Sequence, residues 1–222
     1  MKDIAKTAKK DKDTKDSKES DDTISLNELN SLLAEPKMRL TGIYGEINEE
    51  KCSEAVYGLK YLLNNGIVAK AQDPEDPDSD TILTYEPIQF YISTYGGSAA
   101  DMFAVYDTIR EIRDLCPVHT QGLGKVMSAG VLLLASGTKG ERRIGKNCRV
   151  MIHGVISGQH GHIADVENEF EEAKLTQKMY IKALSEETNM TVKYLRNLVN
   201  KKTNIYLDAE EAVNLGIADI IV

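Results

Sequence analysis

Two spacings of apolar residues alternate along this chain, one typical of strands and one of helices, and this alternation restricts its fold more than any other feature. Short apolar runs such as 88–92 and 148–152 are typical of buried strands. Stretches of helical spacing follow such runs, and Met102, Val105 and Ile109 lie on one helical face. Repeated strand–helix units predict an α/β protein with a largely parallel sheet, in which sites form at the carboxyl ends of strands.

The predicted elements begin at residue 38. Strands are expected at residues 38–44, 88–92, 117–122 and 148–152, and the second strand leads to Gly96 and Gly97. Helices are expected around 102–112 and at 48–64, 128–136, about 163–187 and 191–200. A last helix begins with a capping box, Asp208 to Glu211, and ends at Gly216. Residues 71–87 are rich in acids and prolines and are expected to form an acidic loop.

The first 37 residues differ in composition from the rest of the chain. Residues 1–23 are mostly Lys, Asp, Ser and Thr, so they cannot bury enough apolar surface to fold and are predicted to be disordered. A docking or regulatory tail is one interpretation, and a solubilising leader is the favoured one. Residues 24–37 contain the leucine spacing of a short amphipathic helix, which we expect to pack on the body or on a partner.

Composition argues against several classes of protein. The formal net charge is −8 over 222 residues, which gives nucleic-acid binding little electrostatic support. The longest apolar run, 131–135, is far too short to cross a bilayer, and the first residues lack the apolar stretch of a secretory signal. The three cysteines form no CxxC pair and are expected to be buried thiols in a reduced compartment. We therefore expect a cytoplasmic protein that needs no nucleic acid, membrane, metal or cofactor.

A hydroxyl and an imidazole stand at the ends of predicted strand segments. Ser128 follows the turn Gly124-Lys-Val-Met, and His153 follows the strand-like Arg149-Val-Met-Ile. Each alone has an ordinary interpretation, because serine favours helix N-caps and a lone histidine is commonly a core residue. Together with Gly96 and Gly97 they mark three strand ends, which a parallel sheet brings to one edge. The pair therefore predicts a serine hydrolase in which His153 activates Ser128.

The motifs from about Arg39 to Ile221 resemble those of the Clp protease proteolytic subunits, the ClpP family of serine peptidases. The segment Tyr91-Ile-Ser-Thr-Tyr-Gly-Gly97 is similar to the family's Tyr-Ile-Asn-Ser-Pro-Gly-Gly. Gly124-Lys-Val-Met-Ser-Ala-Gly130 resembles Gly-Gln-Ala-Ala-Ser-Met-Gly, and Arg149-Val-Met-Ile-His153 is identical to the family element, at the same spacing from the serine. Residues 157–161 resemble the glycine-rich strand of the family's handle, and residues 209–219 resemble its closing motif.

The resemblance implies a ClpP/crotonase-like fold for residues 38–222, with a protruding handle at about 155–187. It also implies peptide-bond hydrolysis without a cofactor, with Ser128 as nucleophile and His153 as general base. The backbone N–H groups of Gly97 and Ala129 would form the oxyanion hole. A glycine at position 97 is expected to allow close approach of the substrate backbone, and Ala129 keeps its main-chain donor although the family usually has methionine there.

The third triad position departs from the family pattern. Aligning residues 206–212 with the family's Phe-Met-Ser-Ala-Glu-Glu-Ala places Asn204 where the triad aspartate belongs. The same change in the chymotrypsin triad lowers turnover about 10⁴-fold, because the imidazole is held in the wrong tautomer. Asn204 therefore predicts weak or conditional activity. Asp208 and Asp165 are substitute candidates, but a helix N-cap and a helix-start charge are their favoured roles.

Two functional hypotheses follow from the resemblance. In the first, the chain is a serine endopeptidase that degrades unfolded polypeptides inside a homo-oligomeric tetradecamer of stacked heptameric rings, served by an AAA+ Clp unfoldase. In the second, which Asn204 favours, it is a weakly active or non-catalytic ring subunit that assembles with an active paralogue. A crotonase-type acyl-CoA enzyme would share the fold but does not need the spacing of Ser128 and His153. Other departures are Tyr95 in place of proline, the length of loop 71–87 and the different design of residues 1–35.

Overall fold

The computed structural model describes residues 38–73, 75, 80–201 and 203–222. The predictions for residues 1–23 and 24–37 lie outside these residues. Within the described ranges, every helix is too short or too polar to cross a membrane.

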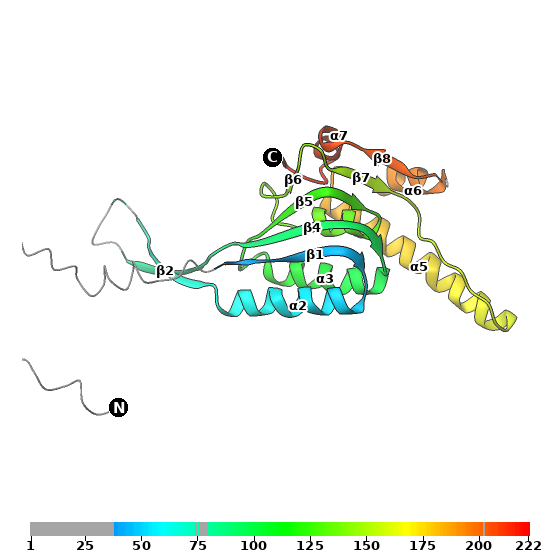
Figure 1. Ribbon diagram of the computed structural model, residues 1–222, viewed down its shortest axis with the longest axis horizontal. Coiled ribbons are helices and arrows are strands. Elements are labelled where there is room, and N and C mark those ends of the chain that lie inside the picture. Colours follow the sequence, from blue (N-terminus) through cyan, green and yellow to red (C-terminus); the bar gives the residue numbers. More distant parts are fainter. Residues whose placement is uncertain (1–37, 74, 76–79, 202) are drawn as a thin grey trace, which may run out of the picture. The chain divides into compact units, whose positions relative to one another are not determined.

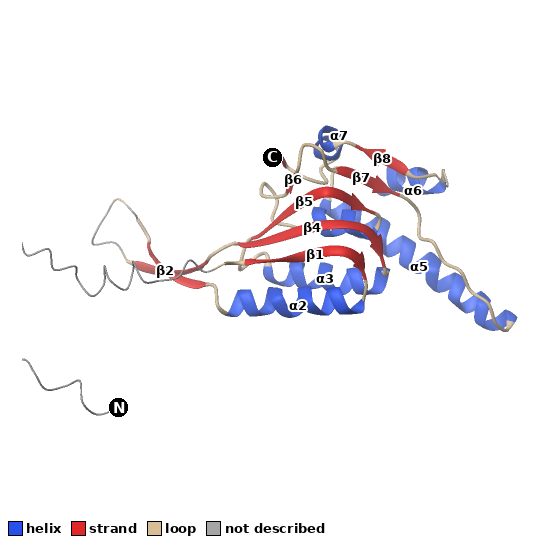
Figure 2. Ribbon diagram, viewed as in Figure 1, coloured by secondary structure: helices blue, strands red, loops and turns tan. Residues whose placement is uncertain are grey.

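A seven-stranded sheet forms the centre of the body (Figures 1 and 2). Strands β1, β4, β5, β6 and β9 follow one another across it and pair in parallel, and β7 pairs in parallel with the end of β5. Strand β8 joins β7 in the antiparallel direction. The bounds are β1 (Leu40–Ile47), β4 (Ile88–Gly97), β5 (Val118–Met127), β6 (Arg143–Ile144), β7 (Arg149–Ile152), β8 (Ile205–Leu207) and β9 (Ile220–Ile221). The predicted α/β class with a largely parallel sheet is confirmed.

Helices α2 (Glu49–Asn64) and α3 (Ala99–Ile112) run along the sheet side by side (Figure 1). Each begins at a residue whose side chain accepts a backbone N–H of the first turn, Asn48 for α2 and Ser98 for α3. Most of the apolar residues on the predicted faces of both helices are buried: Cys52, Ala55, Leu59, Leu62, Met102, Val105, Tyr106, Ile109 and Ile112.

The remaining helices are α4 (Ala129–Ala135), α5 (Ile163–Glu187), α6 (Val192–Asn200) and α7 (Ala209–Asn214). All seven residues of α4 are buried, which confirms the predicted buried helix after Ser128. Helix α7 has the predicted capping box, and Gly216 follows it at φ +74°. Helix α5 has its predicted bounds, and its amino-terminal half projects from the body (Figure 1). Only the part from Tyr180 onward has residues in the core, so the handle is a helix anchored at one end.

The prediction of a loop at 71–87 is wrong. Strands β2 (Ile67–Ala71) and β3 (Thr81–Tyr85) form an antiparallel hairpin separate from the main sheet. Its apolar side chains are largely exposed, with Leu83 the most exposed of them, so the hairpin leaves no buried-face signal in the sequence. The sequence between β2 and β3 and directly after β3 is rich in acids and prolines, and this composition led to the prediction of a loop in place of the strands.

Two other differences concern strands. Strands β4 and β5 each run ten residues, longer than predicted, and β1 begins and ends later than predicted. The short strands β6, β8 and β9 were not predicted, because two or three residues are too few to show a period. The glycine-rich strand expected at 157–161 is absent from this single chain. A strand needs a neighbouring strand to pair with, and this segment runs beside helix α5 instead.

Candidate active site

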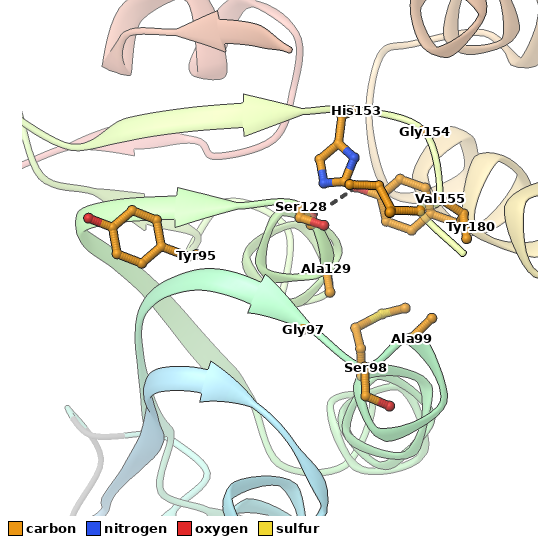
Figure 3. A pocket seen from close by; sticks show the side chains of 12 residues that line it. Tyr95, Gly97, Ser98, Ala99, Ser128, Ala129, His153, Gly154, Val155 and Tyr180 are labelled. Atoms are coloured by element: carbon orange, nitrogen blue, oxygen red, sulfur yellow. Dashed lines mark hydrogen bonds between the residues drawn. The ribbon is translucent and has the colours of Figure 1, made fainter. Parts of the chain in front are cut away.

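A cavity of about 360 Å³ opens at the carboxyl ends of β4, β5 and β7 (Figure 3). The structure brings four of the predicted site residues to its wall, namely Gly97, Ser128, Ala129 and His153. The other lining residues are Tyr95, Ser98, Ala99, Met102, Gly154, Val155, Ile156 and Tyr180. The sheet topology thus places the three strand ends together, as the parallel arrangement predicts.

Ser128 has an unusual backbone at the turn from β5 into α4. Its φ and ψ are 54° and −123°, and it is the sole non-glycine residue with positive φ in the described part of the chain. Such a conformation costs about 1–3 kcal/mol and persists only where the surroundings impose it. Ser128 occupies the N-cap position of α4, but its hydroxyl makes no capping hydrogen bond. The simple N-cap interpretation therefore fails, and the hydroxyl is left to face the cavity.

The main chain around Ser128 is held at three points. Its N–H donates to the Met151 carbonyl oxygen at 2.8 Å, which ties the turn to β7. Its carbonyl oxygen accepts the Val131 N–H at 3.0 Å and the Tyr180 hydroxyl at 3.1 Å (Figure 3). The hydrogen-bonded backbone therefore fixes where the Ser128 side chain begins, while the hydroxyl makes no hydrogen bond to a described residue.

Tyr180 was not among the predicted site residues. Its side chain is buried, and burial raises the pKa of its phenol well above the ordinary value. The hydroxyl is therefore a neutral donor, and it links α5 to the Ser128 turn. Its place on the apolar face of the long helix was predictable, but its partner is set by tertiary packing.

Gly96 and Gly97 are required by close backbone contacts. A Cβ on Gly96 would lie 2.6 Å from the Ser128 Cβ, and the φ of Gly96 is +105°. A Cβ on Gly97 would collide with the carbonyl oxygen of Ile47 on β1. The prediction that Gly97 makes room for the substrate backbone is therefore wrong, because the space is taken up by the neighbouring strand.

His153 follows β7 and is half-buried between two cavities. Its imidazole points toward Ser128 in Figure 3, and both residues line the same cavity. Among the described residues, no hydrogen bond reaches either of its ring nitrogens. The segment after it is fixed by the Val155 N–H, which donates to the Gln177 Oε1 at 3.1 Å.

Asn204 lies on the other side of His153. It lines a second cavity, of about 390 Å³, together with His153, Gln177, Asn200, Thr203 and residues 154–156 and 199. The structure thus brings Asn204, the residue chosen by the sequence alignment, to the same cavity as His153. Its side chain is exposed and makes no hydrogen bond to a described residue.

Neither substitute carboxylate lies in these cavities. Asp208 caps α7 by accepting the Glu211 N–H at 2.8 Å, and Asp165 lies exposed in the first turn of α5. Both therefore have the helix-start positions that we favoured for them. No aspartate or glutamate of the described ranges lines either cavity around His153.

The cysteines offer no alternative nucleophile in this site. All three thiols are free and buried, as predicted, and none lines the cavity. Burial raises the pKa of both Cys52 and Cys148 to about 11, so these thiols are protonated at neutral pH. Over the residues that the structure describes, no group of His, Cys, Asp and Glu side chains could hold a metal ion. The side chains that line the cavity include those of Ser128 and His153.

Comparisons with known proteins agree with this arrangement. The model of the Clp protease family matches residues 80–222. Over 186 residues the chain is 32% identical to the ATP-dependent Clp protease proteolytic subunit 2 of Chlamydia pneumoniae. That alignment covers 84% of this chain and 81% of the relative. Both matches include Ser128, His153 and the motifs around them.

Proposed function

This chain belongs to the Clp protease family, and we propose that it is the proteolytic subunit of an ATP-dependent protease, a serine endopeptidase that cleaves unfolded polypeptides. One observation carries the proposal. The Ser128 hydroxyl is uncapped on a strained turn, beside His153, in a cavity at the strand ends. A serine held in this way is typical of an activated nucleophile, since strain is retained where function needs it.

In the proposed mechanism, the Ser128 Oγ attacks the carbonyl carbon of the scissile peptide bond. His153 takes the hydroxyl proton as general base, and it then protonates the leaving amine as the C–N bond breaks. The acyl fragment, which lies N-terminal to the scissile bond, remains as an ester on Ser128. A water molecule, deprotonated by the same imidazole, hydrolyses that ester and restores the serine.

Two backbone N–H groups are suited to hold the negative oxygen of the tetrahedral intermediate. Ala129 is the first residue of α4, so its N–H has no acceptor within the helix. The Ser98 N–H donates to the Ile47 oxygen on β1, and successive N–H groups of a strand alternate in direction. The Gly97 N–H is therefore directed away from β1, toward the Ser128 turn. Loss of one such donor costs about 3 kcal/mol in other serine peptidases.

Asn204 limits the rate in this proposal. Its carboxamide oxygen can accept an imidazole N–H and favour the productive tautomer, but a neutral amide stabilises the imidazolium less than a carboxylate does. Its amide nitrogen, if turned inward, would favour the wrong tautomer. We therefore expect slow turnover compared with a Ser-His-Asp site.

Assembly and partners are inferred from the family. We propose that copies of the chain form stacked heptameric rings with the handle, α5, between rings, and that an AAA+ Clp unfoldase delivers substrates. Exposed apolar side chains on the projecting part of α5, Ile163 and Phe170, support a contact between subunits there.

A second candidate function is a weakly active or non-catalytic ring subunit that assembles with an active paralogue. The absence of any carboxylate from the two cavities around His153, over the described residues, favours it. The two candidates differ in whether Ser128 is reactive.

A serine-reactive fluorophosphonate probe decides between them. We expect slow labelling of the purified protein that disappears in Ser128→Ala and persists in the control Ser136→Ala, whose hydroxyl is buried and bonded to Leu133. Mass measurement in solution should show a species far larger than one chain. If the probe labels no oligomeric form through Ser128, the peptidase proposal is wrong and the structural subunit stands.

A further inference from the structure

An ammonium group is held at the edge of the candidate active site by an aromatic ring. Lys125 lies on β5, three residues before Ser128, and its Nζ is 4.6 Å from the centre of the Tyr95 ring. Tyr95 lines the cavity with Ser128 and is 71% exposed. The cation is therefore presented where a substrate would pass.

The positive charges at this edge have no acidic partner among the described residues. Arg149 of β7 is in register with Lys125, and in-register residues of parallel strands point to the same face. Among the described residues, no carboxylate lies within ion-pair distance of either side chain. The acid Glu46 on β1 is in register with Gly96 on β4. Since β1 and β5 pair with opposite edges of β4, Glu46 lies on the opposite side of β4 from Lys125. Two basic side chains thus lie on the strands that lead to the cavity, in a chain of net charge −8, and Lys125 reaches the ring of Tyr95 at its wall.

The backbone of β4 extends past its register with β5 next to Tyr95. The last register pair between β4 and β5 joins Thr94 to Val126, so residues 95–97 continue β4 beyond its pairing with β5. An extended peptide that reaches Ser128 must pass this edge, and its alternate side chains would then lie over Tyr95 and Lys125.

We propose that Lys125, positioned by Tyr95, is a specificity residue that favours substrates with a carboxylate side chain near the scissile bond. The inference rests on the proposed peptidase function and adds a substrate class to it. The aromatic face restricts the lysine to fewer conformations, so less entropy is lost when a carboxylate binds. The site is partly exposed, so the selectivity is modest, about fivefold for one charge.

The test measures binding without catalysis. Fluorescent peptides that differ only by Glu, Gln or Lys at one position are titrated against Ser128→Ala protein, and anisotropy gives the dissociation constants. The Glu peptide should bind about fivefold more tightly than the Gln peptide at one or two positions, and the Lys peptide should bind most weakly. Salt at about 0.5 M should reduce these differences.

Variants assign the effect to Lys125. In the same background, Lys125→Gln should remove the preference for Glu, Lys125→Glu should reverse it, and Tyr95→Leu should reduce it. The matched control is Lys146→Gln, which removes an equal charge from an exposed turn outside the cavity. A preference for Glu that survives Lys125→Gln, or equal binding of the three peptides, refutes the inference and leaves the peptidase proposal intact. If none of the peptides binds, both fail.

Discussion

The two sides of His153 differ in how firmly the protein holds them. On one side, the Ser128 backbone is bonded to Met151, Val131 and Tyr180, and Gly96 packs against its side chain. On the other side, Asn204 is exposed and makes no hydrogen bond to a described residue. The fold therefore builds the turn that holds the proposed nucleophile and oxyanion donors as part of its own packing. Among the described residues, nothing equivalent orients the His153 imidazole.

This difference indicates which half of the site the fold itself maintains. The Ser128 turn is coupled to the core, so its geometry persists wherever the chain folds. Asn204, at the position that would orient the imidazole, is exposed and makes no hydrogen bond to a described residue. We therefore expect substitutions of Asn204 to change the free energy of unfolding little. Substitutions on the two sides should accordingly have different consequences.

The largest expected effect is on the nucleophile side. In Gly96→Ala, the new Cβ would meet the Ser128 Cβ at 2.6 Å and would be strained at φ +105°. The displaced turn should lower fluorophosphonate labelling about 10²- to 10³-fold, comparable to losing an oxyanion donor. The control Gly140→Ala has a similar φ, +90°, with no atom near the added Cβ, and should label normally. Equal labelling of the two variants would show that Gly96 does not position Ser128.

Asn204→Asp should have the next largest effect, and in the opposite direction. A carboxylate beside His153 would favour the productive tautomer and stabilise the imidazolium, so labelling should become about 10- to 100-fold faster. Asn200→Asp is the matched control, because it adds the same charge to the same cavity. Removal of the amide in Asn204→Ala should change little. If Asn204→Asp labels no faster than Asn200→Asp, the third position does not limit the rate and the contrast between the two sides loses its main consequence.

Tyr180→Phe tests the hydrogen bond that ties α5 to the nucleophile turn. The variant leaves the Ser128 carbonyl without its second donor and should lower the free energy of unfolding by about 1 kcal/mol. We expect labelling to slow several-fold, because the turn is less firmly held. Tyr194→Phe on α6, which removes an exposed hydroxyl that makes no hydrogen bond to a described residue, is the control for urea unfolding. A labelling rate equal to that of Tyr194→Phe would restrict Tyr180 to a role in stability.

The sequence predicted most of the fold and the firmly held half of the site, and the reasons are local. Helix α5 and the capping box of α7 follow from spacing and cap residues, and the motifs at Ser128 and His153 identified the family, which is confirmed. The predictions that were wrong or missing concern features that depend on tertiary contacts. The hairpin β2–β3 buries no face, the collision partner of Gly97 lies on another strand, and Tyr180 acts through a carbonyl 52 residues away.

The smallest expected effect is at Gln177, whose side chain accepts the Val155 N–H and so anchors the segment after His153. Gln177 and Tyr180 lie three residues apart on one face of α5, so a single helix contacts both sides of the histidine. In Gln177→Leu the Val155 N–H loses its acceptor, and labelling should slow about two- to threefold, roughly the value of one partly exposed hydrogen bond. Gln177→Glu keeps an oxygen in place as acceptor for the Val155 N–H and should restore the rate. If both variants label at the unmodified rate, contacts other than those with α5 hold the segment after His153. The difference between the His153 and Ser128 sides would then not depend on the hydrogen bond of Gln177.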